Sequence, residues 1–172
     1  LLTSSPAFLA GLATTFIALA VIQPSPWYAP RFLLPILGML AGNALSGVSL
    51  VLDTITSSAH RERNVIEARL ALGASRFVAF EECLRRAMRT GMMPVLNAMA
   101  AAGIVSLPGM MTGQILAGID PIEAAKYQIL ILFLIAGSTA IAVLAASIGA
   151  VHFLTDDRHR LRLDHTTAAA RN

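Results

Sequence analysis

Several side chains in or beside the apolar stretches of this chain can contact a cation without carrying a charge themselves. Their amide and hydroxyl oxygens suit hard cations, and thioethers favour soft ions such as Cu(I). The same side chains also bond between membrane helices or fill gaps in packing. We therefore treat them as a candidate transport pathway, with interhelical bonding and packing as alternatives. They are Asn43, Ser46, Asn97, Met110, Met111, Thr112 and Gln114.

Familiar catalytic motifs are missing from the sequence. There is no P-loop, HExxH, Cys-x-x-Cys or Gly-x-Ser-x-Gly pattern, so we expect no enzyme activity and no cofactor bound by this chain. The single cysteine, Cys83, excludes an internal disulfide. His159 and His165 lie among aspartates near the C-terminus, where a loose metal site and a plain charged tail are both possible. The spans carry no central ionisable residue, so the sequence leaves any metal site unlocated.

The composition is that of a membrane protein. Hydrophobic residues make up 56 % of the 172 residues and charged residues 13 %, against roughly 25 % charged in soluble domains. Uncharged runs occupy residues 7–22, 32–52, 91–111 and 129–153. A soluble helical protein, the alternative, would need polar faces at helical spacing, which these runs lack. The sequence predicts an all-α, polytopic transmembrane helical bundle with four spans.

The positions of the basic residues predict the orientation of these spans. Residues 53–90 carry seven arginines and the tail after Phe153 carries four, whereas the other connections carry only Arg31 and Lys126. The positive-inside rule predicts that residues 53–90 and the C-terminus lie in the cytoplasm. We expect the protein in the inner (plasma) membrane of the cell. Glutamates interleave with the arginines, so we expect no nucleic-acid binding. Residues 1–153 then form the transmembrane domain, and residues 154–172 form a polar cytoplasmic tail.

The segment 53–90 is expected to contain two helices. Ser57 or Ser58 is predicted to cap the first, which ends at Gly73, and Ser75 to cap the second, which continues into the third span.

Acidic and basic residues four apart on the second helix predict two ion pairs on a solvated face, Glu81 with Arg85 and Glu82 with Arg86.

Small residues recur at four-residue spacing on the spans, which lets membrane helices approach closely. Packing within one bundle is the simpler explanation, and a dimer seam is the alternative. The three stripes are Gly38, Gly42 and Ser46; Ala98, Ala102 and Ser106; and Ser138, Ala142, Ala146 and Ala150.

The third span is followed by a break. Pro108 and Gly109 interrupt a helix, and Asp120, Pro121 and Glu123 have the pattern of a helix start with a capping box. Interrupted backbone at membrane depth can line a transport cavity, while an ordinary external loop is the alternative.

The sequence EARLALGAS at residues 67–75 resembles the cytoplasmic EAA loop of ABC-transporter permeases. In those proteins this loop forms a short helix that docks into a groove on the ATPase subunit. The resemblance implies that Glu67, Ala68, Gly73 and Ser75 couple the chain to an ABC ATPase subunit, and that ATP binds to that partner.

Longer stretches resemble the Fet-type iron-export permeases and the related plant aluminium-sensitivity half-transporters. They are GNALSGVSLVLD at 42–53, IEARLALGAS at 66–75 and SLPGMMTGQILAGIDPIEAAKYQI at 106–129. The resemblance implies a permease homodimer with a separate ATPase, and export of iron or another metal ion. It also implies that the chain corresponds to roughly the C-terminal two-thirds of such a protein.

Three other functions stay open. The chain can belong to an ABC permease for a different solute, or to a membrane assembly protein that transports nothing. A membrane enzyme would need convergent acid, base or metal-ligating residues at the membrane face, and the sequence offers none outside the tail.

Overall fold

A computed structural model describes residues 30–103 and 108–155, with side chains from Leu37 onward. The predicted first span at residues 7–22 and the tail after Thr155 lie outside these residues. Every regular element of the described ranges is an α-helix, as the sequence predicts. The helices are α2 (Pro30–Arg61), α3 (Arg63–Ala71), α4 (Arg76–Ala79), α5 (Glu81–Ala101), α6 (Gly109–Leu116) and α7 (Pro121–Leu154).

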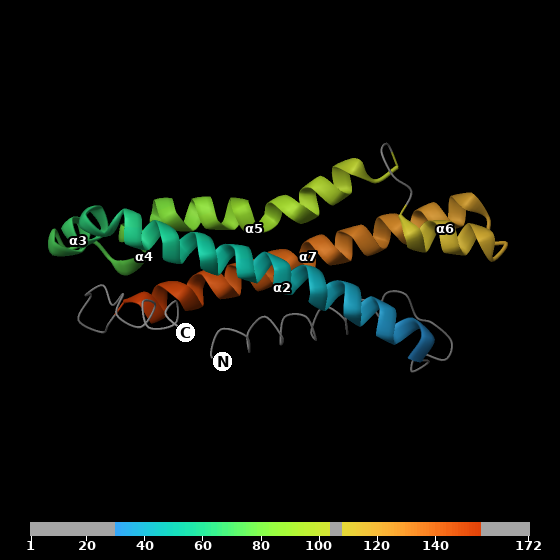
Figure 1. Cartoon of the computed structure of the whole chain (residues 1–172), viewed down its shortest axis with the longest axis horizontal. Helices are drawn as coiled ribbons and strands as arrows, with labels where there is room; N and C mark the ends of the chain where they lie inside the picture. The colour runs from blue at the N-terminus through green and yellow to red at the C-terminus, as the bar shows by residue number, and fades with distance from the viewer. Residues whose placement is uncertain (1–29, 104–107, 156–172) are drawn as a thin grey trace.

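Three long helices, α2, α5 and α7, pack against one another along the length of the molecule (Figure 1). Helices α2 and α7 run in the same direction, and α5 runs antiparallel to both (Figure 1). The short helices α3 and α4 lie at one end of this bundle, and α6 packs on the start of α7 at the other. The C-terminal end of α7 therefore lies at the same end as the predicted coupling segment.

The two most apolar helices are longer than a bilayer is thick. Leu37–Arg61 and Pro121–Leu154 are long and apolar enough to cross a membrane. At about 1.5 Å per residue, the 32 residues of α2 and the 34 of α7 span roughly 48 and 51 Å, against a hydrocarbon core of about 30 Å. Both helices therefore extend beyond the hydrocarbon region.

Two predicted helix boundaries were wrong. The second span continues as helix past residue 52 to Arg61. The third was expected to reach Met111, but α5 ends at Ala101 and Ala102 is extended. The fourth helix begins at Pro121, before its apolar run, as its start pattern predicts. Hydropathy marks where a helix meets lipid, whereas caps and backbone hydrogen bonds decide where it ends.

The predicted serine caps in the 53–90 segment were also wrong. Helix α2 runs straight through them, with Ser57 donating to the carbonyl oxygen of Thr54 at 3.2 Å and Ser58 buried. Ser75 does occupy the N-cap position of α4, but its side chain makes no capping hydrogen bond. The expected continuity of α4 with α5 is interrupted only at Phe80.

The start of α7 matches its sequence pattern in most respects. Asp120 is the N-cap, its Oδ1 accepts from the backbone N–H of Ile122 at 2.8 Å, and Pro121 is the first helical residue. Glu123, expected to complete a capping box, instead accepts from Lys126 Nζ at 2.6 Å.

Two glycines outside the predicted stripes set the closest approach in the bundle. A Cβ atom on Gly91 of α5 would collide with Val51 Cγ2 and lie 3.0 Å from the Gly47 carbonyl oxygen. One on Gly47 of α2 would lie 2.9 Å from Thr139 Cγ2 of α7. The three long helices therefore meet where two of them lack side chains.

The predicted small-residue stripes differ in burial. Ser138, Ala142, Ala146 and Ala150 are all buried, and α7 uses Ala142 and Ala146 to pack against α2. Gly38, Gly42 and Ser46 lie on an exposed face of α2, one residue out of register with Gly47, and Ala98 is exposed too. Only the α7 stripe is a packing seam between the described helices.

Candidate functional site

The predicted coupling segment forms a compact tip at one end of the bundle. Helix α3 ends in a Schellman motif: the N–H of Gly73 bonds to the carbonyl of Leu70, and that of Ala74 to the carbonyl of Arg69. Gly73 adopts a φ of 87°, a left-handed conformation that suits glycine. The expected role of Gly73 as the helix C-terminus is confirmed, and the chain reverses there into α4.

Buried side chains attach this tip to all three long helices. Ile66 of α3 and Ala79 of α4 join Phe80 in a core cluster with residues of α2, α5 and the end of α7. Phe80 is fully buried and is the largest such side chain among the described residues. Because these anchors are close-packed, a displacement of the tip is transmitted to the bundle.

The outer side of the tip is apolar and unusually exposed. Leu72, beside the α3–α4 turn, is 88 % exposed, and Val65, Phe77 and Val78 are also exposed. The Phe77 ring makes an edge contact with His152 of α7, at a centroid distance of 5.5 Å. Exposed apolar side chains grouped in this way are typical of a protein–protein contact.

The residues implied by the EAA-like sequence lie along this tip. Glu67 accepts from Arg63 Nε at 2.8 Å within α3, and the adjacent Ala68 is exposed. Gly73 and Ser75 flank the turn. All four residues lie on the α3–α4 segment, and their role in coupling stays a prediction.

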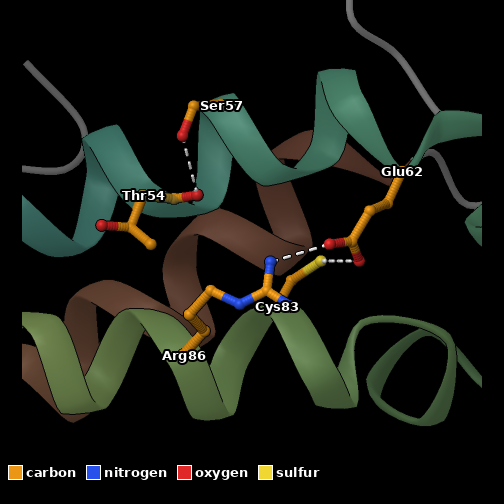
Figure 2. Close-up of polar contacts among 5 residues, drawn as sticks. All are labelled: Thr54, Ser57, Glu62, Cys83 and Arg86. Atoms are coloured by element: carbon orange, nitrogen blue, oxygen red, sulfur yellow. Dashed lines mark hydrogen bonds and ion pairs between the residues drawn. The ribbon is translucent and has the colours of Figure 1, made fainter.

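A polar cluster ties the beginning of the tip to α5, and the sequence analysis missed it (Figure 2). Glu62, at the junction of α2 and α3, accepts from Arg86 at 2.8 Å and from the Cys83 thiol at 3.5 Å. Arg86 was expected to pair with Glu82 and instead pairs with a residue 24 positions earlier. The Glu81–Arg85 pair does form, at 3.3 Å on an exposed surface.

Two pKa shifts follow from this geometry. The Arg86 hydrogen bond holds the pKa of Glu62 below its ordinary value. Burial, with the Glu62 charge, raises the pKa of the Cys83 thiol to about 11. Cys83 is therefore a neutral hydrogen-bond donor to Glu62 at physiological pH.

The candidate pathway residues on α2 donate hydrogen bonds within their own helix, and the one on α5 is exposed. Asn43 Nδ2 donates to the Met39 carbonyl at 2.8 Å, and Ser46 Oγ donates to the Gly42 carbonyl at 3.0 Å. Asn97 is exposed on α5. The two α2 side chains are thus satisfied within their own helix, which membrane helices commonly do with serine and threonine.

The candidate pathway residues on α6 have different surroundings. Met110 packs against a core cluster that includes Leu40 and Ile131, while Met111 lines a cavity. Thr112 Oγ1 donates to the Pro108 carbonyl at 3.3 Å, and Gln114 is half-buried. Within residues 30–103 and 108–155 no three His, Cys, Asp or Glu side chains gather to hold a metal ion.

The comparison with known proteins decides the family. The model of the uncharacterised protein family UPF0014 matches residues 2–154. This chain belongs to UPF0014. No solved structure matches it.

Three relatives indicate what kinds of protein this chain is similar to. A UPF0014 membrane protein of Synechocystis is 41 % identical over 74 % of this chain and 49 % of its own length. The probable iron export permease protein FetB of Escherichia coli is 33 % identical over 84 % of this chain and 56 % of its own length. The protein ALUMINUM SENSITIVE 3 of Arabidopsis thaliana is 32 % identical over 81 % of this chain and 50 % of its own length.

These matches confirm the resemblance drawn from the sequence and, with the apolar helices, support a membrane protein that is similar to a probable iron export permease. The matched part of the chain spans about half the length of these relatives.

Proposed function

We propose that this UPF0014 chain is part of the permease subunit of an ABC transporter, and that it exports iron or another metal ion with ATP hydrolysed by a separate subunit. The observation that carries the proposal is the tip formed by α3 and α4. It presents exposed apolar side chains on its outer side, and buried residues fix its inner side to three long helices.

The tip has the properties needed to receive motion from a soluble partner. Leu72 and Val78 offer apolar contacts for a groove, and Arg69 and Arg76 add positive charge beside them. In the proposed cycle, ATP binding closes two ATPase domains and displaces the two tips of a permease homodimer. Phe80, because it is buried among α2, α5 and α7, passes this displacement to the spans.

The direction and the cargo rest on separate support. The arginine asymmetry favours a cytoplasmic tip and C-terminus in the plasma membrane, and the tip and the C-terminal end of α7 lie at one end of the bundle, as that orientation requires. The name of FetB, a probable iron export permease, supports iron as the cargo. We still propose that the oxygen and thioether side chains named above form the transport pathway. Substitution of Met110 and Met111 is its first test.

A photo-crosslinking experiment tests the docking surface. Benzoylphenylalanine replaces Leu72 in the full-length protein, co-expressed with an ABC ATPase subunit from the same organism. We expect an adduct of the summed mass after illumination. The matched position is Leu45, equally apolar and 62 % exposed but in the middle of α2, where no adduct should form. Absence of an adduct at position 72, in protein that is correctly inserted, would overturn the coupling role.

Metal content tests the cargo. Deleting the gene should raise cellular iron in metal-loaded cells, measured by mass spectrometry, and the wild-type gene should restore it. The double change of Met110 and Met111 to Leu should restore it less well, because leucine keeps the apolar volume but removes both thioethers. Accumulation of a different metal would reassign the cargo. Unchanged content of every metal would favour another solute or a non-transporting assembly protein.

A further inference from the structure

A cavity of about 470 Å³ lies at the end of the bundle opposite the α3–α4 tip. Its walls come from three elements: Met99 at the end of α5, Pro108 and Met111 at the start of α6, and the first turns of α7. Cavities of roughly 300–1,000 Å³ are the usual size of small-molecule sites. The space therefore has the dimensions of a ligand site and not of a packing defect.

One polar side chain, Gln128, is set into this apolar wall. Gln128 is only 8 % exposed because it lies on the inner face of α7, in line with Ala124 and Ile131. Its Oε1 atom accepts no hydrogen bond from any described residue. A buried amide without a partner is costly, and proteins rarely leave one unless something else supplies the bond.

The remaining lining restricts what that partner can be. The other lining residues are apolar or glycine, so an ionised group would find no opposite charge there. Ile129 and Phe133 line the cavity and are themselves 56 % and 64 % exposed, so its mouth opens between apolar side chains on the outer surface of α7. Because α7 is one of the two helices long and apolar enough to cross a membrane, a membrane amphiphile is a ligand that such a mouth can admit.

We propose that this cavity binds an uncharged amphiphile from the membrane, whose alkyl chain fills the apolar space and whose hydroxyl group donates to Gln128 Oε1. The last torsion of a glutamine side chain is broad, so the amide can turn towards the space without straining the helix. The site lies far along the bundle from Leu72, so it does not depend on the proposed docking of an ATPase.

Photolabelling with a matched pair of probes tests this assignment. The full-length protein in lipid nanodiscs receives dodecanol carrying a diazirine on its chain, or the same hydrocarbon without the hydroxyl. We expect saturable labelling by the alcohol on peptides that contain Met99, Met111 or Leu132, located by mass spectrometry. The hydrocarbon should label those peptides about threefold to tenfold more weakly, the range that one neutral hydrogen bond contributes.

Two polar-to-apolar variants provide the matched comparison. Gln128→Leu should reduce labelling by the alcohol to the level of the hydrocarbon, whereas Thr90→Val, on α5 but outside the cavity wall, should leave it unchanged. Ala125→Phe should block labelling by filling the space. Equal, non-saturable labelling by both probes on the wild-type protein would mean simple partitioning and would overturn the proposal. So would an unlabelled cavity, which would indicate that another protein segment occupies it.

Discussion

At the scale of single residues, Glu62 connects two parts of the chain that the sequence keeps apart. Its carboxylate reaches from the α2–α3 junction to Arg86 and Cys83 on α5. The side chain of Glu62 is 26 % exposed and that of Arg86 46 %, so solvent weakens the pair without removing it. The contact holds the first turn of the tip against α5.

Arg86→Gln is expected to loosen this junction. The variant should unfold at a lower temperature in detergent, and the amide protons of α3 should exchange faster, because Glu62 loses its charged partner. Arg85→Gln is the matched control, since Arg85 makes only an exposed pair with Glu81 and should change little. Equal effects of the two variants would show that the Glu62 contact contributes nothing specific.

The same contact predicts a pH dependence. A carboxyl group whose pKa is lowered by folding stabilises the protein above its unfolded pKa, and this contribution is lost as the pH falls through the folded value. Acidification should therefore destabilise the wild-type protein in this window. In Arg86→Gln the pKa of Glu62 returns towards its ordinary value. The loss of thermal stability on acidification should therefore be smaller in this variant than in the wild-type protein.

At the scale of elements, the contact between α2 and α5 depends on two missing side chains. Gly91→Ala places a methyl group against Val51 and the backbone of Gly47, so the helices must separate. Overpacking of this kind typically destabilises a protein by about 1–3 kcal/mol. Gly137→Ala on α7 meets nothing within 4 Å and should instead stabilise its helix by roughly 0.5–1 kcal/mol. Thermal or detergent unfolding of the two variants should move in opposite directions.

The turn between α3 and α4 depends on Gly73 in a different way. A φ of 87° is strained for any residue with a Cβ and is inaccessible to proline. Gly73→Asn should be tolerated, Gly73→Ala should destabilise the turn by about 1 kcal/mol, and Gly73→Pro should break it. Stimulation of the partner's ATPase activity should fall in that order while the protein stays in the membrane. Full stimulation by Gly73→Pro would show that the turn geometry is not used in coupling.

At the scale of the whole molecule, the two ends of the bundle should lie on opposite sides of the membrane. Ser57 is near the α3–α4 end, and Gly118 follows α6 at the other. A cysteine introduced at position 57 should react with an impermeant maleimide only from the cytoplasmic side, and one at position 118 only from outside. Labelling of both from one side would contradict the orientation derived from the arginines.

The sequence by itself determined the helical membrane fold, the start of α7 and the reversal at Gly73. These features depend on local composition: apolar runs need helices in lipid, Asp120-Pro121 favours a helix start, and glycine favours the left-handed conformation. The resemblance to the family was readable for the same reason, since its motifs are contiguous.

The tertiary structure decided which residues meet. Arg86 pairs with Glu62 and not with the predicted Glu82. Helices α2 and α5 meet at Gly47 and Gly91, and not along the predicted stripe of Gly38, Gly42 and Ser46. Gln128, one amide within an apolar run, became part of a cavity wall only when α5, α6 and α7 came together. Each of these outcomes depends on how the helices rotate and shift against one another. The spacing of residues along one helix determines which of them share a face, but not which helix packs on that face.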